Sequence, residues 1–105
     1  MTPYMTIKTE ATRQNLPEHY RTDLIKHDRL QLRKKDAPTQ FVWVLRQCGT
    51  HLIGKYADDD ANRRKFTLTY LEGIRESNPK ALFYIYRAGQ LHKSTYDNCR
   101  EFLSK

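Results

Sequence analysis

Two pairs of residues have the types and spacing that could carry chemistry. Arg46 is followed by His51, and Arg87 is followed by His92 at the same separation, with a Gly inside each interval. Two His side chains can serve as general base and general acid, while Arg can stabilise charge that develops on a phosphate. If the two turns lie side by side, these four residues would suit a small metal-independent ribonuclease.

Each of these residues also has an ordinary structural explanation. A His in a strand is commonly a half-exposed strand residue, and an Arg at a strand end extends its charged head into water. Because no motif fixes a reaction, we expect a protein without catalytic activity. The ribonuclease built on Arg46, His51, Arg87 and His92 stays as an alternative.

Metal and thiol chemistry have weaker support. Cys48 and His51 have the spacing of a ligand pair, but structural zinc requires four ligands, usually in two close pairs. The acidic run at 58–60 is better explained as a helix cap. Cys48 as a nucleophile would lack the helix N-terminus that commonly activates a thiolate. No glycine-rich phosphate loop is present, and we expect neither a metal nor a cofactor.

The overall charge indicates an anionic partner. The 105 residues include 19 Lys and Arg against 12 Asp and Glu, which gives a net charge of +7. Such a balance favours nucleic acid, an acidic protein surface or a membrane surface. The absence of a signal-peptide pattern and of a long apolar run predicts a cytoplasmic protein that does not enter a membrane. A chain of this length is expected to be a single domain over 1–105.

Basic and aromatic residues mixed along the chain favour nucleic acid among these partners. Tyr84 and Tyr86 share one face of a predicted strand, and exposed strand aromatics can stack on single-stranded bases. Basic runs can hold phosphates. The alternative is that the two Tyr rings pack under a helix. The candidate nucleic-acid-binding residues are Arg33, Lys34, Lys35, Arg63, Arg64, Lys65, Tyr84, Tyr86 and Arg87.

Two β-hairpins must position these candidates, and they are predicted at 41–53 and 81–93. The run from Phe41 to Leu45 is apolar on both faces, which is typical of a central strand covered by helices. Gly49 is expected to supply a positive φ in the first turn, and Ala88-Gly89 forms the second turn.

Three helices are predicted around the hairpins, at 17–33, 59–76 and 95–104. Capping patterns mark their starts, and apolar residues then recur at helical spacing. The segment at 65–71 also reads as a strand, which leaves two assignments open there. Residues 1–15 show no clean period and are expected to form a loose N-terminal arm.

The sequence therefore predicts an α+β fold, in which a small antiparallel sheet of two hairpins packs against three helices. We expect a basic cytoplasmic accessory or regulatory protein that binds an anionic macromolecule, nucleic acid in particular, without catalysis. One alternative is a protein-binding or inhibitor module that uses its aromatic hairpins. The other is the ribonuclease.

Overall fold

Two antiparallel hairpins form the centre of the computed structural model. The structure describes residues 2–15, 18–47, 49–55 and 60–105, without the side chains of 18–24. In this part of the chain there are four helices and four strands. In chain order they are α1 (Pro3–Arg13), α2 (Glu18–Leu32), β1 (Gln40–Arg46), β2 (Gly49–Lys55), α3 (Ala61–Ser77), β3 (Leu82–Arg87), β4 (Gln90–Ser94) and α4 (Tyr96–Ser104).

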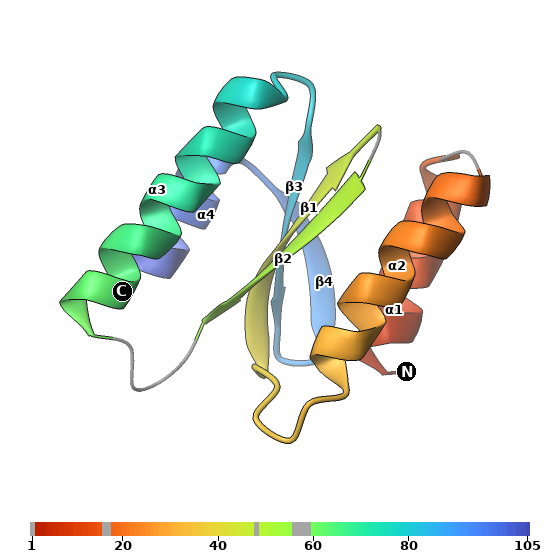
Figure 1. The fold of residues 1–105 in the computed structure, drawn as a ribbon, viewed down its shortest axis with the longest axis horizontal. Helices are drawn as coiled ribbons and strands as arrows, with labels where there is room; N and C mark the ends of the chain where they lie inside the picture. Colours follow the sequence, from red (N-terminus) through yellow and green to blue (C-terminus); the bar gives the residue numbers. More distant parts are fainter. Residues whose placement is uncertain (1, 16–17, 48, 56–59) are drawn as a thin grey trace.

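The strands pair antiparallel in the order β2-β1-β3-β4, so β1 and β3 are central. Phe41 pairs with Tyr86 at one end of the β1–β3 ladder, and Leu45 pairs with Leu82 at the other. Because the two central strands run in opposite directions, the β1–β2 turn and the β3–β4 turn lie at opposite ends of the sheet (Figure 1). The predicted α+β class and antiparallel sheet are confirmed.

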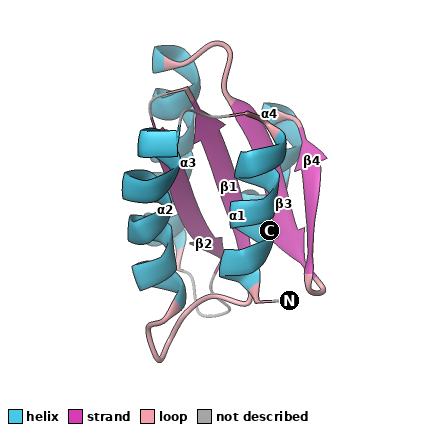
Figure 2. Cartoon of the chain, turned by 90° about the vertical axis from the view of Figure 1, so that its right-hand side faces the viewer, coloured by secondary structure: helices cyan, strands magenta, loops and turns pink. Residues whose placement is uncertain are grey.

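Helices cover both faces of this sheet. The helices α1 and α2 lie on one face and α3 and α4 on the other (Figures 1 and 2). Strand β1 serves both cores: Phe41 and Trp43 pack towards α1 and α2, while Val42 and Val44 pack towards α3 and α4. Alternate side chains of a strand point to opposite faces, so an apolar run on both faces needs this double cover.

The expected loose arm at 1–15 is instead the helix α1, which makes four helices rather than three. Thr2 caps the helix by accepting a hydrogen bond from the Met5 N–H, and Pro3 occupies its first turn. Ile7 and Ala11, one turn apart, are fully buried against the sheet. The prediction was wrong because only a narrow apolar stripe faces the core, which is too weak a pattern to reveal a helix.

The other three helices lie close to their predicted bounds. Helix α3 settles the open assignment, because residues 65–71 are helical. Asp60 caps α3: its carboxylate accepts a hydrogen bond from the Arg63 N–H at 2.7 Å. The other two acidic residues of the predicted cap, at 58 and 59, lie outside the described residues.

The two hairpin turns differ in where the backbone has a positive φ. The positive φ expected at Gly49 is absent; positive φ occurs instead at Ala88 (52°) and Gly89 (76°). Two positive φ values in a two-residue loop match the twist of the flanking strands. A Cβ at Gly49 would meet the guanidinium of Arg46, which is the far end of a flexible side chain and can shift to make room.

A candidate anion-binding groove

The two Arg–His pairs do not meet. His51 pairs with Val44 on β2, whereas His92 pairs with Ile85 on β4. The two His belong to opposite edge strands with β1 and β3 between them, and three strand spacings separate them by about 14 Å. An acid and a base that act on one phosphate must both lie within hydrogen-bond reach of it. The convergence required by the ribonuclease hypothesis is therefore wrong.

His51 instead links β2 to α3. Its Nδ1 lies 2.8 Å from the hydroxyl of Tyr70, and the two rings meet edge to face. Burial lowers the pKa of His51, and the positive charge of Arg46 lowers it further. A neutral imidazole hydrogen-bonded to a neighbouring helix has a structural explanation, so we assign neither His51 nor Arg46 to a binding or catalytic site.

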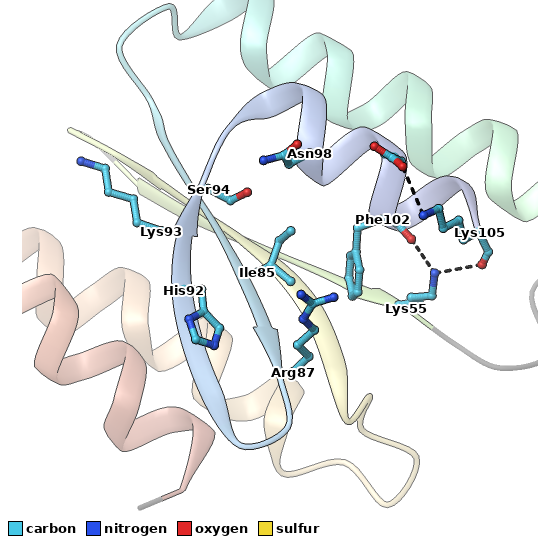
Figure 3. Close-up of a pocket in the computed structure, with 10 residues that line it drawn as sticks. Lys55, Ile85, Arg87, His92, Lys93, Ser94, Asn98, Phe102 and Lys105 are labelled. Carbon is cyan, nitrogen blue, oxygen red and sulfur yellow. Dashed lines mark hydrogen bonds and ion pairs between the residues drawn. The ribbon is translucent and has the colours of Figure 1, made fainter.

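The other pair, Arg87 and His92, lines a surface groove of about 340 Å³ between β4 and α4 (Figure 3). Strand alternation places these side chains. Ile85 points towards α4, so Arg87, two residues later, lies on the same face, and His92 lies opposite Ile85. The groove is therefore a consequence of the β3–β4 register.

Two further polar side chains complete the groove walls. Ser94 lies opposite Phe83 at the end of β4, and Asn98 lies in the first turn of α4, where Thr95 caps the helix. The side chains of Arg87, His92, Ser94 and Asn98 form no hydrogen bond or ion pair with any described residue. Ser94 and Asn98 were missed because, in the sequence, they look only like part of a helix-capping pattern.

The C-terminal turn of α4 lines one end of the groove. The Lys55 ammonium donates to the backbone carbonyls of Phe102 and Lys105 and lies 4.8 Å from the centre of the Phe102 ring. The Lys105 ammonium pairs with Glu101 at 3.1 Å. Cations at a helix C-terminus stabilise its unpaired carbonyls, so this wall is held in place by its own contacts. No sequence signal indicated Lys55.

The basic run Arg33, Lys34 and Lys35 lies at the same end of the sheet as the groove. All three side chains are exposed in the linker between α2 and β1. That linker leads into Gln40, which pairs with Lys55, while the next residue, Phe41, pairs with Tyr86 beside Arg87. We call this end of the sheet the basic end, and its cations are Arg33, Lys34, Lys35, Arg87 and Lys105. The first three follow α2 on one face of the sheet, and the last two line the groove on the α4 face. Figure 1 shows the α2–β1 linker and the β3–β4 turn at the lower side of the molecule.

The third predicted basic run lies apart from the groove. Arg64 and Lys65 line a different surface pocket, of about 340 Å³, together with Arg100 of α4. Arg63 lies on the side of α3 that faces β2. The structure therefore brings Arg33–Lys35 and Arg87 to one end of the sheet and spreads residues 63–65 around a helix.

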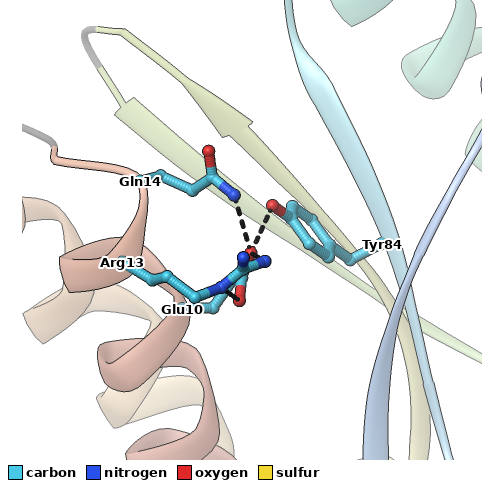
Figure 4. Close-up of polar contacts among 4 residues, drawn as sticks. All are labelled: Glu10, Arg13, Gln14 and Tyr84. Atoms are coloured by element: carbon cyan, nitrogen blue, oxygen red, sulfur yellow. Dashed lines mark hydrogen bonds and ion pairs between the residues drawn. The ribbon is translucent and has the colours of Figure 1, made fainter.

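Tyr84 and Tyr86 are not exposed. Only 1% and 5% of their surfaces are accessible, because both rings pack under α1 and α2. The Tyr84 hydroxyl donates to Glu10 at 2.8 Å (Figure 4), and the Tyr86 ring stacks on Phe41. The expected platform for bases is therefore wrong, and packing under a helix, the alternative, is what the structure shows.

Glu10 was not predicted to have any role. Arg13 and Gln14 also donate to its carboxylate, so it links α1 to β3 through Tyr84. Burial raises the pKa of Glu10, but these hydrogen bonds outweigh that effect and hold its pKa below the usual value. No sequence pattern indicates that Glu10 and Tyr84, which are far apart in the chain, are in contact.

Comparison with known proteins adds no relative: no family model matches the chain, and searches of curated proteins and of solved structures returned no match. Within the described residues, no cluster of three or more His, Cys, Asp and Glu could hold a metal ion, and no helix has the length and apolar character to cross a membrane. Cys48, considered as a ligand or nucleophile, lies outside the described residues.

Proposed function

We propose that this protein binds nucleic acid at its basic end, in an accessory or regulatory role in the cytoplasm and without catalysing a reaction. One observation carries the proposal. The groove holds an unpartnered Arg87, and this residue lies at the same end of the sheet as the exposed run Arg33–Lys35. Exposed cations gathered at one end of a protein of net charge +7 favour a polyanion over a small neutral ligand.

The mode of binding depends on which groups are accessible. An Arg guanidinium offers a planar fork of donors that matches two oxygens of a phosphate. The rings of Tyr84 and Tyr86 are buried, so they contribute no stacking on bases. Affinity then rests on phosphate contacts, which carry little sequence information. We expect binding that depends strongly on salt and weakly on base sequence.

Arg87→Ala tests this proposal, with Lys80→Ala as the matched control. Lys80 is exposed in the turn before β3, at the opposite end of the sheet, so both variants lose one positive charge. Affinity for labelled single- and double-stranded DNA and RNA is measured by fluorescence anisotropy in about 50 to 200 mM salt. We expect Arg87→Ala to weaken binding about tenfold, the equivalent of one charge-assisted hydrogen bond, and Lys80→Ala to change it less than about twofold.

Two results would contradict the proposal. Absence of binding by the wild type near 50 mM salt, or an affinity that does not fall with salt, would exclude phosphate recognition, because phosphate contacts must release counterions (roughly 0.9 per contact). An equal loss of affinity in Arg87→Ala and Lys80→Ala would show that binding depends on the net charge of the protein and not on the cations of the basic end.

A second candidate, a protein-binding module, is favoured by a different surface. The aromatic residues of the hairpins are buried, so they cannot be the contact that this alternative assumed. Phe66 of α3, however, is 73% exposed and lines a groove of about 230 Å³ between α3 and the edge strand β2. Exposed aromatic residues beside an unpaired strand edge are common features of protein contacts.

Phe66→Ser tests this second candidate, and Leu30→Ser is its control. Leu30 is also a largely exposed apolar residue (62%) but lies on α2. The immobilised wild type should retain a stoichiometric partner from native lysate, Phe66→Ser should lose that partner, and Leu30→Ser should keep it. Recovery of no stoichiometric partner by the wild type, or equal recovery by both variants, would count against a contact at Phe66.

A further inference from the structure

We propose that the groove between β4 and α4 binds the terminal phosphate monoester of a nucleic-acid strand. The inference rests on the proposed function and adds the ligand group that the groove takes. Its basis is a convergence of donors. Four polar side chains line one groove, come from the three elements β3, β4 and α4, and have no partner in the described part of the chain: Arg87, His92, Ser94 and Asn98.

The donors lie close enough to act on one group. Arg87 and His92 are diagonal neighbours across the β3–β4 ladder, since Arg87 pairs with Gln90 and His92 with Ile85. Diagonal pairs on one sheet face lie within reach of long side chains. Figure 3 shows the guanidinium and the imidazole on the same side of the hairpin, with Ser94 and Asn98 further along the groove.

The charge of a terminal phosphate suits these donors better than that of an internal one. A phosphate monoester carries a charge of about −1.5 to −2 at neutral pH and three strong acceptor oxygens, whereas each internal phosphate carries one negative charge. The carboxylate of Glu101, which also lines the groove, is already paired with the Lys105 ammonium. The unpartnered donors therefore have no acceptor of their own and could serve three oxygens together.

The size of the groove also favours a strand end. Its volume of about 340 Å³ lies at the lower end for ligand pockets, which suits one nucleotide rather than a run of them. Lys55, Phe102 and Lys105 line the end of the groove next to the C-terminal turn of α4, and the contacts of Lys55 hold that end in place. Ile85 and Phe102 provide an apolar surface for the terminal nucleoside.

The experiment compares one oligonucleotide sequence with three kinds of end: a 5′-phosphate, a 3′-phosphate, or hydroxyls only. We expect the wild type to bind at least one phosphorylated form about tenfold more tightly than the hydroxyl form, because one charge-assisted contact is gained. Which form is preferred identifies the strand end. Arg87→Ala and Asn98→Ala should reduce the ratio towards one, while Lys80→Ala should keep it.

The outcomes separate this inference from the proposed function. Equal, salt-dependent affinity for all three oligonucleotides would overturn the inference and leave nucleic-acid binding in place. Absence of binding to any of them would overturn both. Arg87 and Asn98 are exposed, so folding should survive both substitutions, and an unchanged circular dichroism spectrum checks this. A ratio retained in both variants would also overturn the inference, because the preference would then arise elsewhere.

Discussion

At the scale of single residues, the most constrained group is the carboxyl of Asp28. Its side chain is fully buried where α2 packs on the sheet. The Trp43 indole donates to Oδ2 at 2.8 Å, the Thr50 hydroxyl donates to the same oxygen, and Oδ1 has no partner. Burial raises the pKa of Asp28, and the two hydrogen bonds, with nearby His27, offset this only in part. A buried acid with a raised pKa makes stability depend on pH.

The sign of that dependence is set by proton binding. The folded state holds the Asp28 proton more tightly than the unfolded chain, whose pKa is near 3.8. This tighter proton binding stabilises the folded state. The stabilisation is complete at pH values below the unfolded pKa and is lost as pH rises through the folded pKa. Asp28→Asn stays neutral, so the free energy of unfolding of this variant minus that of the wild type should increase with pH, by at most about 1.4 kcal/mol per pH unit.

Urea unfolding followed by fluorescence of Trp43, the single Trp of the chain, measures this difference. Asp36→Asn, at an exposed position in the α2–β1 linker, is the matched control, because it replaces one carboxyl outside the buried site. If Asp28→Asn gave a constant difference, the carboxyl would have the same proton affinity in both states, and the raised pKa would be excluded.

The sequence indicated which residues could carry chemistry, but it did not indicate which distant residues they contact. Arg87 and His92 were correctly placed together by their spacing around one turn, because a hairpin is a local structure. Glu10 and Tyr84, or Asp28 and Trp43, meet only after helices dock on the sheet. A charged residue gives no signal in the sequence that it will be buried, since burial depends on a partner elsewhere in the chain.

At the scale of elements, α1 shows how a helix can escape prediction and still be part of the core. Ile7 contacts the cluster that holds Phe41, Trp43 and Tyr86, so we expect Ile7→Ala to lower the free energy of unfolding by about 2 to 4 kcal/mol. Met5 lies in the same helix but is largely exposed, and Met5→Ala should cost less than about 0.5 kcal/mol.

Urea unfolding of both variants measures the two costs. Similar small values for Ile7→Ala and Met5→Ala would mean that α1 adds nothing to the core, as a loose arm would. The hairpins, in contrast, were predicted within a few residues, because an apolar run followed by a Gly-containing turn specifies strands locally. Helix α1 has no such pattern; its helical state depends on the sheet it covers.

At the scale of the whole molecule, strand direction decided which candidate residues could act together. The two hairpins do lie side by side through β1 and β3, but those strands are antiparallel, so their turns point away from each other. No local pattern in the sequence contains that information. The result separates Arg46 and His51 from Arg87 and His92 and places Arg33–Lys35 at the same end of the sheet as Arg87.

The same arrangement sets the expected salt dependence of nucleic-acid binding. The charge of +7 looks evenly spread along the sequence, whereas the fold gathers Arg33, Lys34, Lys35, Arg87 and Lys105 at one end. If about four of these contact phosphates, the slope of log K against log salt should be roughly −3 to −4, depending on the form of the nucleic acid. Loss of Arg87 should make that slope about one unit shallower.

The two cores also determine when this protein can fold during its synthesis. The helices α1 and α2 precede the sheet strands they cover, yet their core needs Tyr84 and Tyr86 from β3. The opposite core joins Val42 and Ile53 to Leu71 and Leu103. A ribosome that has released only the first 55 residues therefore leaves both cores incomplete, with Val42 and Ile53 without their cover from α3 and α4. Neither half of the chain can become native until most of the other has emerged, so folding is expected to wait until α4 has left the ribosome.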